Sequence, residues 1–243
     1  PETWIPVYPL WADMGSYGEW GNDAAKKLYR RLHENSLQVG SPEAKRIAAA
    51  CRKAKVHVML GVNERAGKSI YNALLYINDK GELMGHHRKL VPTFGERLVW
   101  GHGDAAGLQT HETQFGRIGG LVCWEHWMPF ARHVLHSEGE VIHIAAWPHG
   151  KEMHQIASRH YAFEGRCFVL AAGMYLEKQM MPRDYELRDE LKDAPDVLIP
   201  GGSAIISPDG SYIVEPVFGR EELIVAEIET DRAIEESLTL DVT

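Results

Sequence analysis

In the first part of the chain, the pattern of apolar and polar residues predicts two helices. Residues 22–38 form the first helical stretch, and the second opens at Ser41-Pro42-Glu43, where a serine before proline is a typical helix start. Cys51 falls on the apolar face of this second helix. We therefore expect its side chain in the core.

The next segments have the pattern of strands. Residues 56–62 and 71–77 are rich in apolar and β-branched side chains, and the turn Asn78-Asp79-Lys80-Gly81 joins the second of them to residues 82–90. This arrangement predicts an antiparallel hairpin.

Strands and helices alternate in the rest of the chain. The pattern predicts a buried strand at 117–123, a helix ending at Gly139, a strand at 140–147, a helix through Glu164, a strand at 167–173, a hairpin about Pro208-Asp209-Gly210, a strand at 222–228 and a short helix from Thr230. Such alternation is typical of an α/β domain with mixed sheets covered by helices.

The composition and charge of the chain limit the kinds of molecule that we expect it to bind. The chain has 243 residues, 44% hydrophobic and 25% charged, which suits one large folded domain. Its net charge is −8, and no basic stripe offers a footprint for nucleic acid. The longest apolar stretches are about half of the roughly 20 residues that cross a bilayer, and no signal peptide precedes them. We therefore expect a soluble, cytoplasmic protein without nucleic-acid or membrane partners.

Cysteine and histidine do not form the spacing patterns of metal sites. The three cysteines are Cys51, Cys123 and Cys167, which are far apart and include no CxxC pair, so a disulfide framework is not expected. The thirteen histidines include no HExxH motif. His86 and His87 are adjacent and point to opposite sides of a strand. His126, His133 and His136 fall on a helix. We expect no metal site and place most histidines at the surface or at an interface.

Cys123 lies at the junction of an apolar strand and a helix that begins near Pro129. A nucleophile at such a turn projects from the end of the sheet, and backbone N–H groups together with the helix N-terminus favour a thiolate. A buried structural cysteine explains this stretch equally well.

Lys89 lies in a segment rich in glycine and proline that reads as an ordered, irregular loop. Its ammonium can stabilise charge on a substrate as the attacked carbon becomes tetrahedral, and Glu96 can pair with it and orient it. Taken alone, the segment fits an ordinary surface Lys-Glu pair better.

Three segments together resemble the nitrilase superfamily, and its nitrilase branch in particular. They are PETWIPVYPLW at the start, FGERLVWGHGD after the lysine, and LVCWEHWMPFAR, and the likeness runs from Pro1 to about residue 232. The resemblance implies a Glu-Lys-Cys triad made of Glu2, Lys89 and Cys123, with Glu96 as an additional active-site glutamate. It also implies a four-layer α-β-β-α sandwich, no metal or organic cofactor, and homo-oligomers that pair and often form spirals.

The family's usual opening strand and helix, ahead of the glutamate motif, have no counterpart in the sequence. We therefore expect residues 1–243 to form a single carbon-nitrogen hydrolase domain that lacks its natural N-terminal strand and helix and a C-terminal extension.

The residues after the cysteine bear on the substrate. Cys-Trp-Glu resembles nitrilases more than amidases, so the expected reaction is hydrolysis of a nitrile to a carboxylic acid and ammonia through a thioimidate and an acyl-enzyme. The expected substrate-binding residues are Tyr8, Trp124, Glu125, Trp147 and Pro148, of which Tyr8, Trp147 and Pro148 fit core packing equally well. Two alternatives stay open: an amidase or carbamoylase with the same triad, and a non-catalytic scaffold or inactive fragment of the fold.

Overall fold

The chain folds into two compact units, each built from separate stretches of the sequence. The computed structural model describes residues 1–240, apart from the side chains of residues 15 and 16. Residues 3–105 and 176–198 form the hairpin unit, and residues 1–2, 106–175 and those from 199 onward form the crossover unit. The single domain expected over residues 1–243 stays a prediction, and its last three residues lie outside the described part.

The hairpin unit is built on a three-stranded sheet. Its strands are β1 (Val58–Ala66), β2 (Ser69–Ile77) and β3 (Leu83–Arg88), and all neighbours run antiparallel. The predicted hairpin is confirmed. Mixed sheets were predicted, but this sheet is antiparallel throughout, because tight turns rather than crossover helices join its strands.

A buried ionic group joins the outer strands of this sheet. Glu64 in β1 accepts hydrogen bonds from Arg88 at 2.7 Å and from His86 at 2.8 Å. Burial alone would raise the pKa of the Glu64 carboxyl, but the Arg88 and His86 hydrogen bonds outweigh it and lower that pKa to about 2.

Both predicted helices of the hairpin unit are present. They are α1 (Asp23–Asn35) and α2 (Pro42–Ala54), and the side chains of Asn22 and Ser41 accept hydrogen bonds from the first-turn N–H groups. Cys51 in α2 is 4% exposed, as expected of a core residue.

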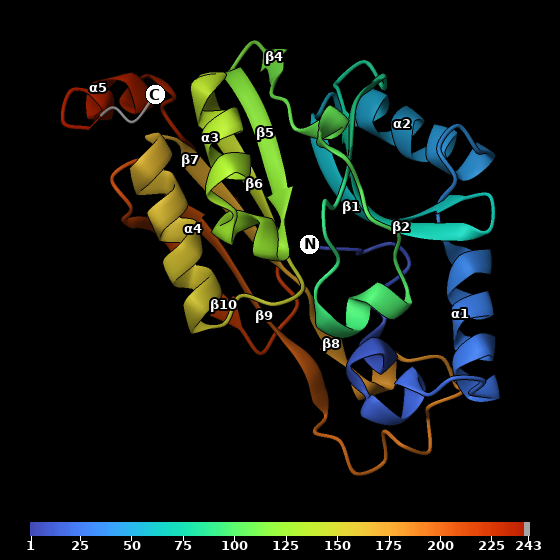
Figure 1. The fold of residues 1–243 in the computed structure, drawn as a ribbon. Coiled ribbons are helices and arrows are strands. Elements are labelled where there is room, and N and C mark those ends of the chain that lie inside the picture. The colour runs from blue at the N-terminus through green and yellow to red at the C-terminus, as the bar shows by residue number, and fades with distance from the viewer. Residues whose placement is uncertain (241–243) are drawn as a thin grey trace. The chain divides into compact units, whose positions relative to one another are not determined.

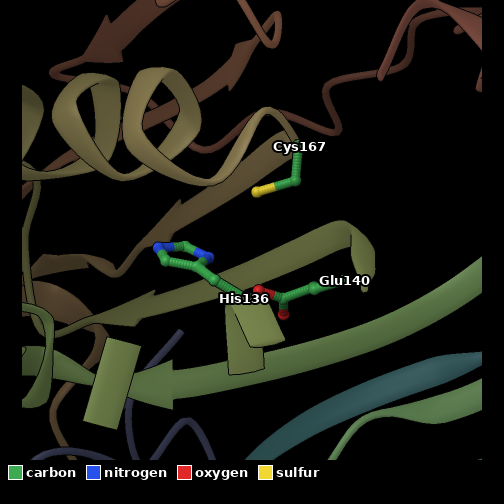
Figure 2. A group of neighbouring side chains, drawn as sticks. All are labelled: His136, Glu140 and Cys167. Carbon is green, nitrogen blue, oxygen red and sulfur yellow. The ribbon is translucent and has the colours of Figure 1, made fainter. Parts of the chain in front are cut away.

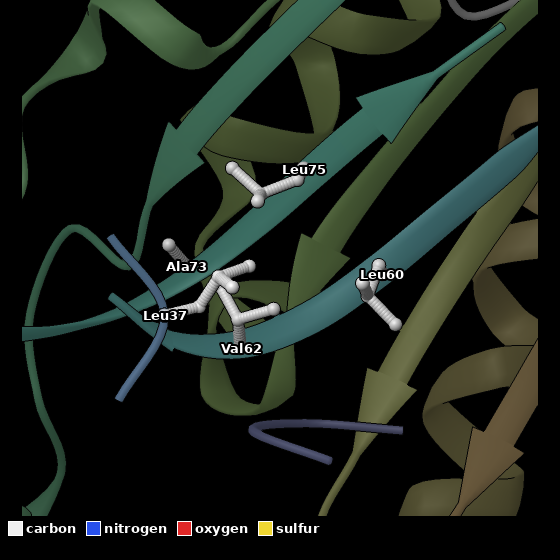
Figure 3. Packing of buried hydrophobic residues seen from close by; sticks show 5 residues of the cluster. All are labelled: Leu37, Leu60, Val62, Ala73 and Leu75. Atoms are coloured by element: carbon white, nitrogen blue, oxygen red, sulfur yellow. The ribbon is translucent and has the colours of Figure 1, made fainter. Parts of the chain in front are cut away.

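An apolar cluster fills the space between α2 and this sheet. Figure 3 shows its buried members, which come from β1, β2 and the segment between the helices: Leu37, Leu60, Val62, Ala73 and Leu75. Ala44 and Ile47 of α2 pack against them. Burial of this apolar face is what holds the helix on the sheet.

The crossover unit contains a larger, mixed sheet. Its path is β10-β9-β7-β6-β5-β4. The strands are β4 (His111–Thr113), β5 (Gly116–Val122), β6 (Glu140–Trp147), β7 (Phe168–Gly173), β9 (Val197–Ile206) and β10 (Tyr212–Phe218). The boundary between the two units falls within the short strand β8 (Tyr175–Glu177). The central β5, β6 and β7 run parallel, whereas β4, β9 and β10 pair antiparallel with their neighbours.

Helices α3 (Pro129–Ser137) and α4 (Glu152–Gly165) make the crossovers between the parallel strands. Both lie along one face of the sheet (Figure 1). The carboxyl ends of β5 and β6 therefore meet at one edge, where open α/β sheets commonly place their ligands. Cys123 follows β5 and Trp147 ends β6, so the fold brings these two segments to the same edge.

The predicted strand at residues 222–228 is wrong. That segment has no regular structure, and Leu223 and Val225 are 88% and 77% exposed. An alternating pattern without a neighbouring strand to complete its hydrogen bonds does not stay extended in a sheet. The final short helix is confirmed as α5 (Asp231–Ser237), directly after Thr230. None of the described helices is long and apolar enough to span a bilayer.

Candidate active site

Cys123 begins a tight turn directly after β5. The turn is the 3-10 helix η5 (Cys123–Trp127), and α3 follows it from Pro129, so the expected turn between strand and helix is present. The backbone of Cys123 is left-handed, with φ at 50°, and its side chain is 3% exposed. A residue with a side chain adopts this conformation only where its surroundings impose it, and such strain concentrates at functional sites.

The side chain of Glu125 stabilises the start of this turn by a hydrogen bond to the backbone. It is fully buried and accepts a hydrogen bond from the Val122 N–H at 2.7 Å. Trp124 is 53% exposed and packs edge-on against Trp127, with ring centroids 5.3 Å apart. Of these two expected substrate-binding residues, Trp124 is thus open to contact, while Glu125 supports the backbone at Cys123.

Glu2 lies beside Cys123 in the crossover unit. A carboxylate oxygen of Glu2 is within 4.8 Å of the Cys123 sulfur, and both residues are buried. The backbone N–H of Glu2 donates to the Trp147 carbonyl at 3.1 Å, which fixes this residue to the end of β6. Two members of the expected triad are therefore brought together from segments over a hundred residues apart.

Trp147 and Pro148 extend the edge next to Glu2. The indole of Trp147 is fully buried, donates to the Ser158 hydroxyl at 2.9 Å and stacks on His126 with centroids 4.4 Å apart. Pro148 is half-buried, and its carbonyl accepts a hydrogen bond from Met174. These contacts fit the core-packing role that the sequence left open for Trp147.

Lys89 occupies the hairpin unit, one residue beyond β3. Its backbone N–H donates to the Asn72 carbonyl at 2.8 Å, and its own carbonyl accepts from Gly103 at 2.8 Å. The side chain is 1% exposed, and its Nζ donates to Glu96 at 2.6 Å. The pair is thus a buried ion pair with a fixed backbone, and the exposed surface pair that the segment alone favoured is wrong.

Glu96 collects three hydrogen bonds inside the hairpin unit. Besides Lys89, the Tyr8 hydroxyl donates to it at 2.9 Å and the Thr93 N–H at 2.6 Å. Tyr8 is buried, and its ring meets Trp100 edge-on at 5.7 Å. The structure therefore joins Tyr8, Lys89 and Glu96, which the sequence proposed for different reasons.

Trp100 was missed by the sequence reasoning. Its indole N–H donates to Asn63 at 2.8 Å, and its ring centroid lies 5.8 Å from Lys89 Nζ. An aromatic residue inside a segment rich in glycine and close to a candidate lysine is the signal that could have found it, because such rings stabilise a neighbouring cation.

The histidine predictions need correction. His126 belongs to η5 rather than to the following helix, and His87, His126, His136 and His143 are buried rather than at the surface. Burial, with a smaller contribution from His143, lowers the pKa of His126 to about 3, so this imidazole is neutral at physiological pH. Spacing along the chain did not reveal the burial of His126, because the rings that cover it come from β6 and α4.

A family model described as carbon-nitrogen hydrolase matches residues 1–235. The chain belongs to the carbon-nitrogen hydrolase family. This carbon-nitrogen hydrolase is 35% identical to a protein of Lupinus angustifolius named bifunctional nitrilase/nitrile hydratase, over all of the chain and 70% of that relative. It is 38% identical to a nitrilase of Pseudomonas syringae, over 91% of the chain and 67% of the relative.

The crystal structure of Saccharomyces cerevisiae Nit3, described as a member of branch 10 of the nitrilase superfamily, has the same fold. It matches with a TM-score of 0.70 at 18% identity, over 89% of this chain and 76% of that one. The predicted family and the predicted α-β-β-α class are thereby confirmed. The chain is a hydrolase of carbon-nitrogen bonds other than peptide bonds.

Proposed function

We propose that this carbon-nitrogen hydrolase converts a nitrile to a carboxylic acid and ammonia, with Cys123 as the nucleophile. The observation that carries the proposal is the buried carboxyl of Glu2 within 4.8 Å of the Cys123 sulfur, on a left-handed turn. A carboxylate next to a thiol is the arrangement that activates a sulfur nucleophile. The order Cys-Trp-Glu and the names of the relatives support nitrile as the substrate class.

In the first step Glu2 accepts the thiol proton while the Cys123 sulfur attacks the nitrile carbon. A carbon-sulfur bond forms and one π bond of the nitrile breaks, so the nitrogen takes the electron pair and then a proton. The product is a thioimidate. The Trp124 N–H, directly after the nucleophile, stabilises the charge as it develops.

Hydrolysis then needs two waters. Glu2 takes a proton from the first water, which adds to the thioimidate carbon. Ammonia leaves and an acyl thioester remains. The second water cleaves the carbon-sulfur bond, which releases the carboxylic acid and returns the proton to the sulfur. Atoms balance for one nitrile and two waters giving one acid and one ammonia.

Lys89 is the proposed cation of the reaction. The mechanism requires its ammonium to reach the substrate nitrogen and then the tetrahedral oxygen. Glu96 orients that ammonium through its 2.6 Å hydrogen bond, and Tyr8 in turn orients Glu96. A cation held in advance stabilises a developing anion without reorganising during the reaction.

The remaining expected site residues take supporting roles in this proposal. We assign the exposed Trp124 and the half-buried Pro148 to substrate contact, Tyr8 to Glu96, and the buried Glu125 and Trp147 to the support of Cys123 and Glu2. A homo-oligomer and a cytoplasmic location stay predictions.

Paired substrates test the reaction class. Purified enzyme would be incubated with benzonitrile, phenylacetonitrile and propionitrile, and with the amide of each, while ammonia, acid and amide are measured. We expect ammonia and acid from at least one nitrile, at a rate well above that of its amide. Turnover of the amides alone would replace nitrile hydrolysis by an amidase activity, and no turnover of any substrate would refute the proposal.

A further inference from the structure

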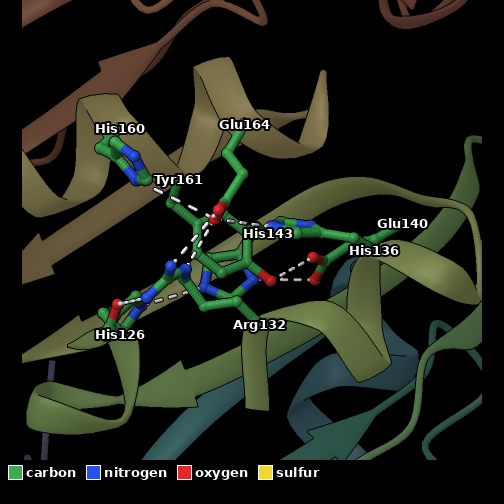
Figure 4. A network of polar contacts seen from close by, with 8 residues as sticks. All are labelled: His126, Arg132, His136, Glu140, His143, His160, Tyr161 and Glu164. Atoms are coloured by element: carbon green, nitrogen blue, oxygen red, sulfur yellow. Dashed lines mark hydrogen bonds and ion pairs between the residues drawn. The ribbon is translucent and has the colours of Figure 1, made fainter. Parts of the chain in front are cut away.

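A chain of buried hydrogen bonds runs from the carbonyl of Cys123 into the crossover unit. His126 Nδ1 lies 2.7 Å from the Cys123 oxygen, and His126 Nε2 lies 3.0 Å from His143 Nε2. His143 Nδ1 lies 2.8 Å from one oxygen of Glu140, and the Tyr161 hydroxyl donates to the other at 2.6 Å (Figure 4). The proposed mechanism uses none of these side chains directly.

The Cys123 carbonyl, at the start of this series of hydrogen bonds, determines which atom donates and which accepts in each of them. A carbonyl oxygen can only accept, so His126 Nδ1 carries the hydrogen and, in the neutral ring, Nε2 accepts from His143. A neutral His143 that donates through Nε2 must accept at Nδ1. Glu140 is the group that lies at Nδ1, and it can donate there only if its carboxyl is protonated.

We infer that Glu140 is kept as a neutral carboxylic acid and acts, through His143 and His126, as a positioning residue for the peptide that joins Cys123 to Trp124. The inference rests on the proposed function, because that peptide supplies the Trp124 N–H. A peptide unit is planar and trans, so its carbonyl and its N–H point in opposite directions. Holding the Cys123 oxygen on His126 therefore aims the Trp124 N–H the other way.

The surroundings of Glu140 favour the neutral form. The groups around its carboxyl are the Gly119 N–H of β5, His136 of α3 and the following Glu138, His143 of β6, Tyr161 of α4, and Cys167. Glu164 and Arg166 line the same cavity, but Glu164 pairs with Arg132, and the Arg166 guanidinium donates to the Pro208 carbonyl and lies 3.9 Å from Glu236. Figure 2 shows the His136 ring and the Cys167 thiol turned toward the same space as the carboxyl. None of these groups around the carboxyl is a lysine or arginine.

The pKa values of these neighbours agree with the inference. Burial is the main cause in each case: it lowers the pKa of His136, lowers that of His143 well below its usual value, and raises that of the Cys167 thiol. It also raises the pKa of Glu140 to about 8. Glu140 thus has no cationic partner among these groups and lies near the acidic Glu138, so a carboxylate would lack the compensation that a buried charge needs.

Two substitutions at Glu140 give opposite expectations. Glu140→Gln keeps one N–H donor for His143 and one oxygen for Tyr161, whereas Glu140→Leu has a similar volume and neither group. With the best nitrile of the panel at pH 7, we expect Glu140→Leu to lower kcat on the order of 10-fold to 100-fold, with KM changed less than about 3-fold, because a transition-state donor is misdirected. Glu140→Gln should restore kcat to within about 3-fold of wild type.

The pH profile separates the positioning role from a merely structural one. Above a pH of about 8 the wild-type carboxyl loses its proton and can no longer donate to His143, so kcat should fall. Glutamine has no such proton, and Glu140→Gln should lack this fall. A glutamine variant that loses more than about 10-fold in kcat at pH 7 while folded would overturn the inference.

Cys123→Ala distinguishes the two proposals. If that variant still hydrolyses nitriles, the proposed function fails. If it is inactive while folded Glu140→Leu turns over like wild type, the positioning role alone fails.

A measurement on the wild type covers the case in which Glu140→Leu does not fold. Nitrogen-15 NMR of the histidine rings at pH 7, assigned with His143→Asn, reports which ring nitrogens carry hydrogen. We expect His143 to be neutral, with the hydrogen on Nε2 only. A doubly protonated His143 would mean a Glu140 carboxylate and would overturn the inference.

Discussion

Replacing Glu96 by glutamine tests the buried ion pair of the hairpin unit. The carboxylate accepts hydrogen bonds from Lys89 at 2.6 Å, Tyr8 at 2.9 Å and Thr93 at 2.6 Å, and Lys89 is 1% exposed. Glutamine has nearly the same shape but no charge. The variant would therefore remove the Glu96 charge that pairs with the buried Lys89 ammonium.

The expected loss of stability is large for a single conservative change. Removing one partner of a buried ion pair costs about 3–5 kcal/mol, because the remaining charge stays desolvated. Tyr8→Phe is the matched control, since it deletes one of the hydrogen bonds to Glu96 and leaves the ion pair. It should cost about 1.5–3 kcal/mol, the range for a hydrogen bond to a charged group.

Urea unfolding of four proteins measures the interaction energy between Lys89 and Glu96. The set is wild type, Glu96→Gln, Lys89→Met and the double variant. The double variant loses both charges of the pair at once, so it should be more stable than the sum of the single effects predicts, by about 1–3 kcal/mol. Strict additivity, or a Glu96→Gln protein within about 1 kcal/mol of wild type, would refute the reasoning that Glu96 holds Lys89.

Three further outcomes are expected. Gly95→Ala should destabilise the loop that carries Glu96, because a Cβ there would lie 2.1 Å from the Ala12 carbonyl oxygen, whereas Gly18→Ala meets its nearest atom at 3.4 Å and should unfold thermally like wild type. Because the pKa of Glu64 is lowered to about 2, its carboxylate stabilises the fold above pH 4.5 and loses this effect as the pH falls toward about 2. When the urea midpoint is plotted against pH, Glu64→Gln should therefore show a smaller fall in the acid range than wild type, and an unchanged fall would contradict this. Iodoacetamide at neutral pH, read by peptide mass spectrometry, should label Cys123 much faster than the other two cysteines, whose pKa values burial raises; equal rates would contradict an activated thiol.

Local pattern was sufficient for most elements of the fold. Each predicted strand and helix from residue 117 to 173 is present, since a buried apolar run and an amphipathic run differ in period and are separated by turns such as that at Gly139. The segment 222–228 shows the limit. Its alternation is that of a strand, but whether a neighbour lies alongside is decided by the rest of the chain.

Part of the candidate site could likewise be predicted from the sequence, and part could not. Resemblance proposed Glu2, Lys89 and Cys123, and the spacing of Lys89 and Glu96 suggested their pairing. No local pattern joins His126 to Glu140 through His143, because that connection depends on η5 packing against β6. The sequence placed most histidines at the surface or at an interface, whereas burial, a property of the packed structure, joins His126 and His143 in a network.

The most direct test of Cys123 as the nucleophile is ammonia release by Cys123→Ala with the nitrile that wild type hydrolyses best. Circular dichroism and the urea midpoint establish that the variant is folded, and Cys51→Ala serves as the matched thiol deletion. We expect Cys51→Ala to turn over like wild type and Cys123→Ala to lose at least about 10⁴-fold in kcat. Normal turnover by folded Cys123→Ala would contradict that role.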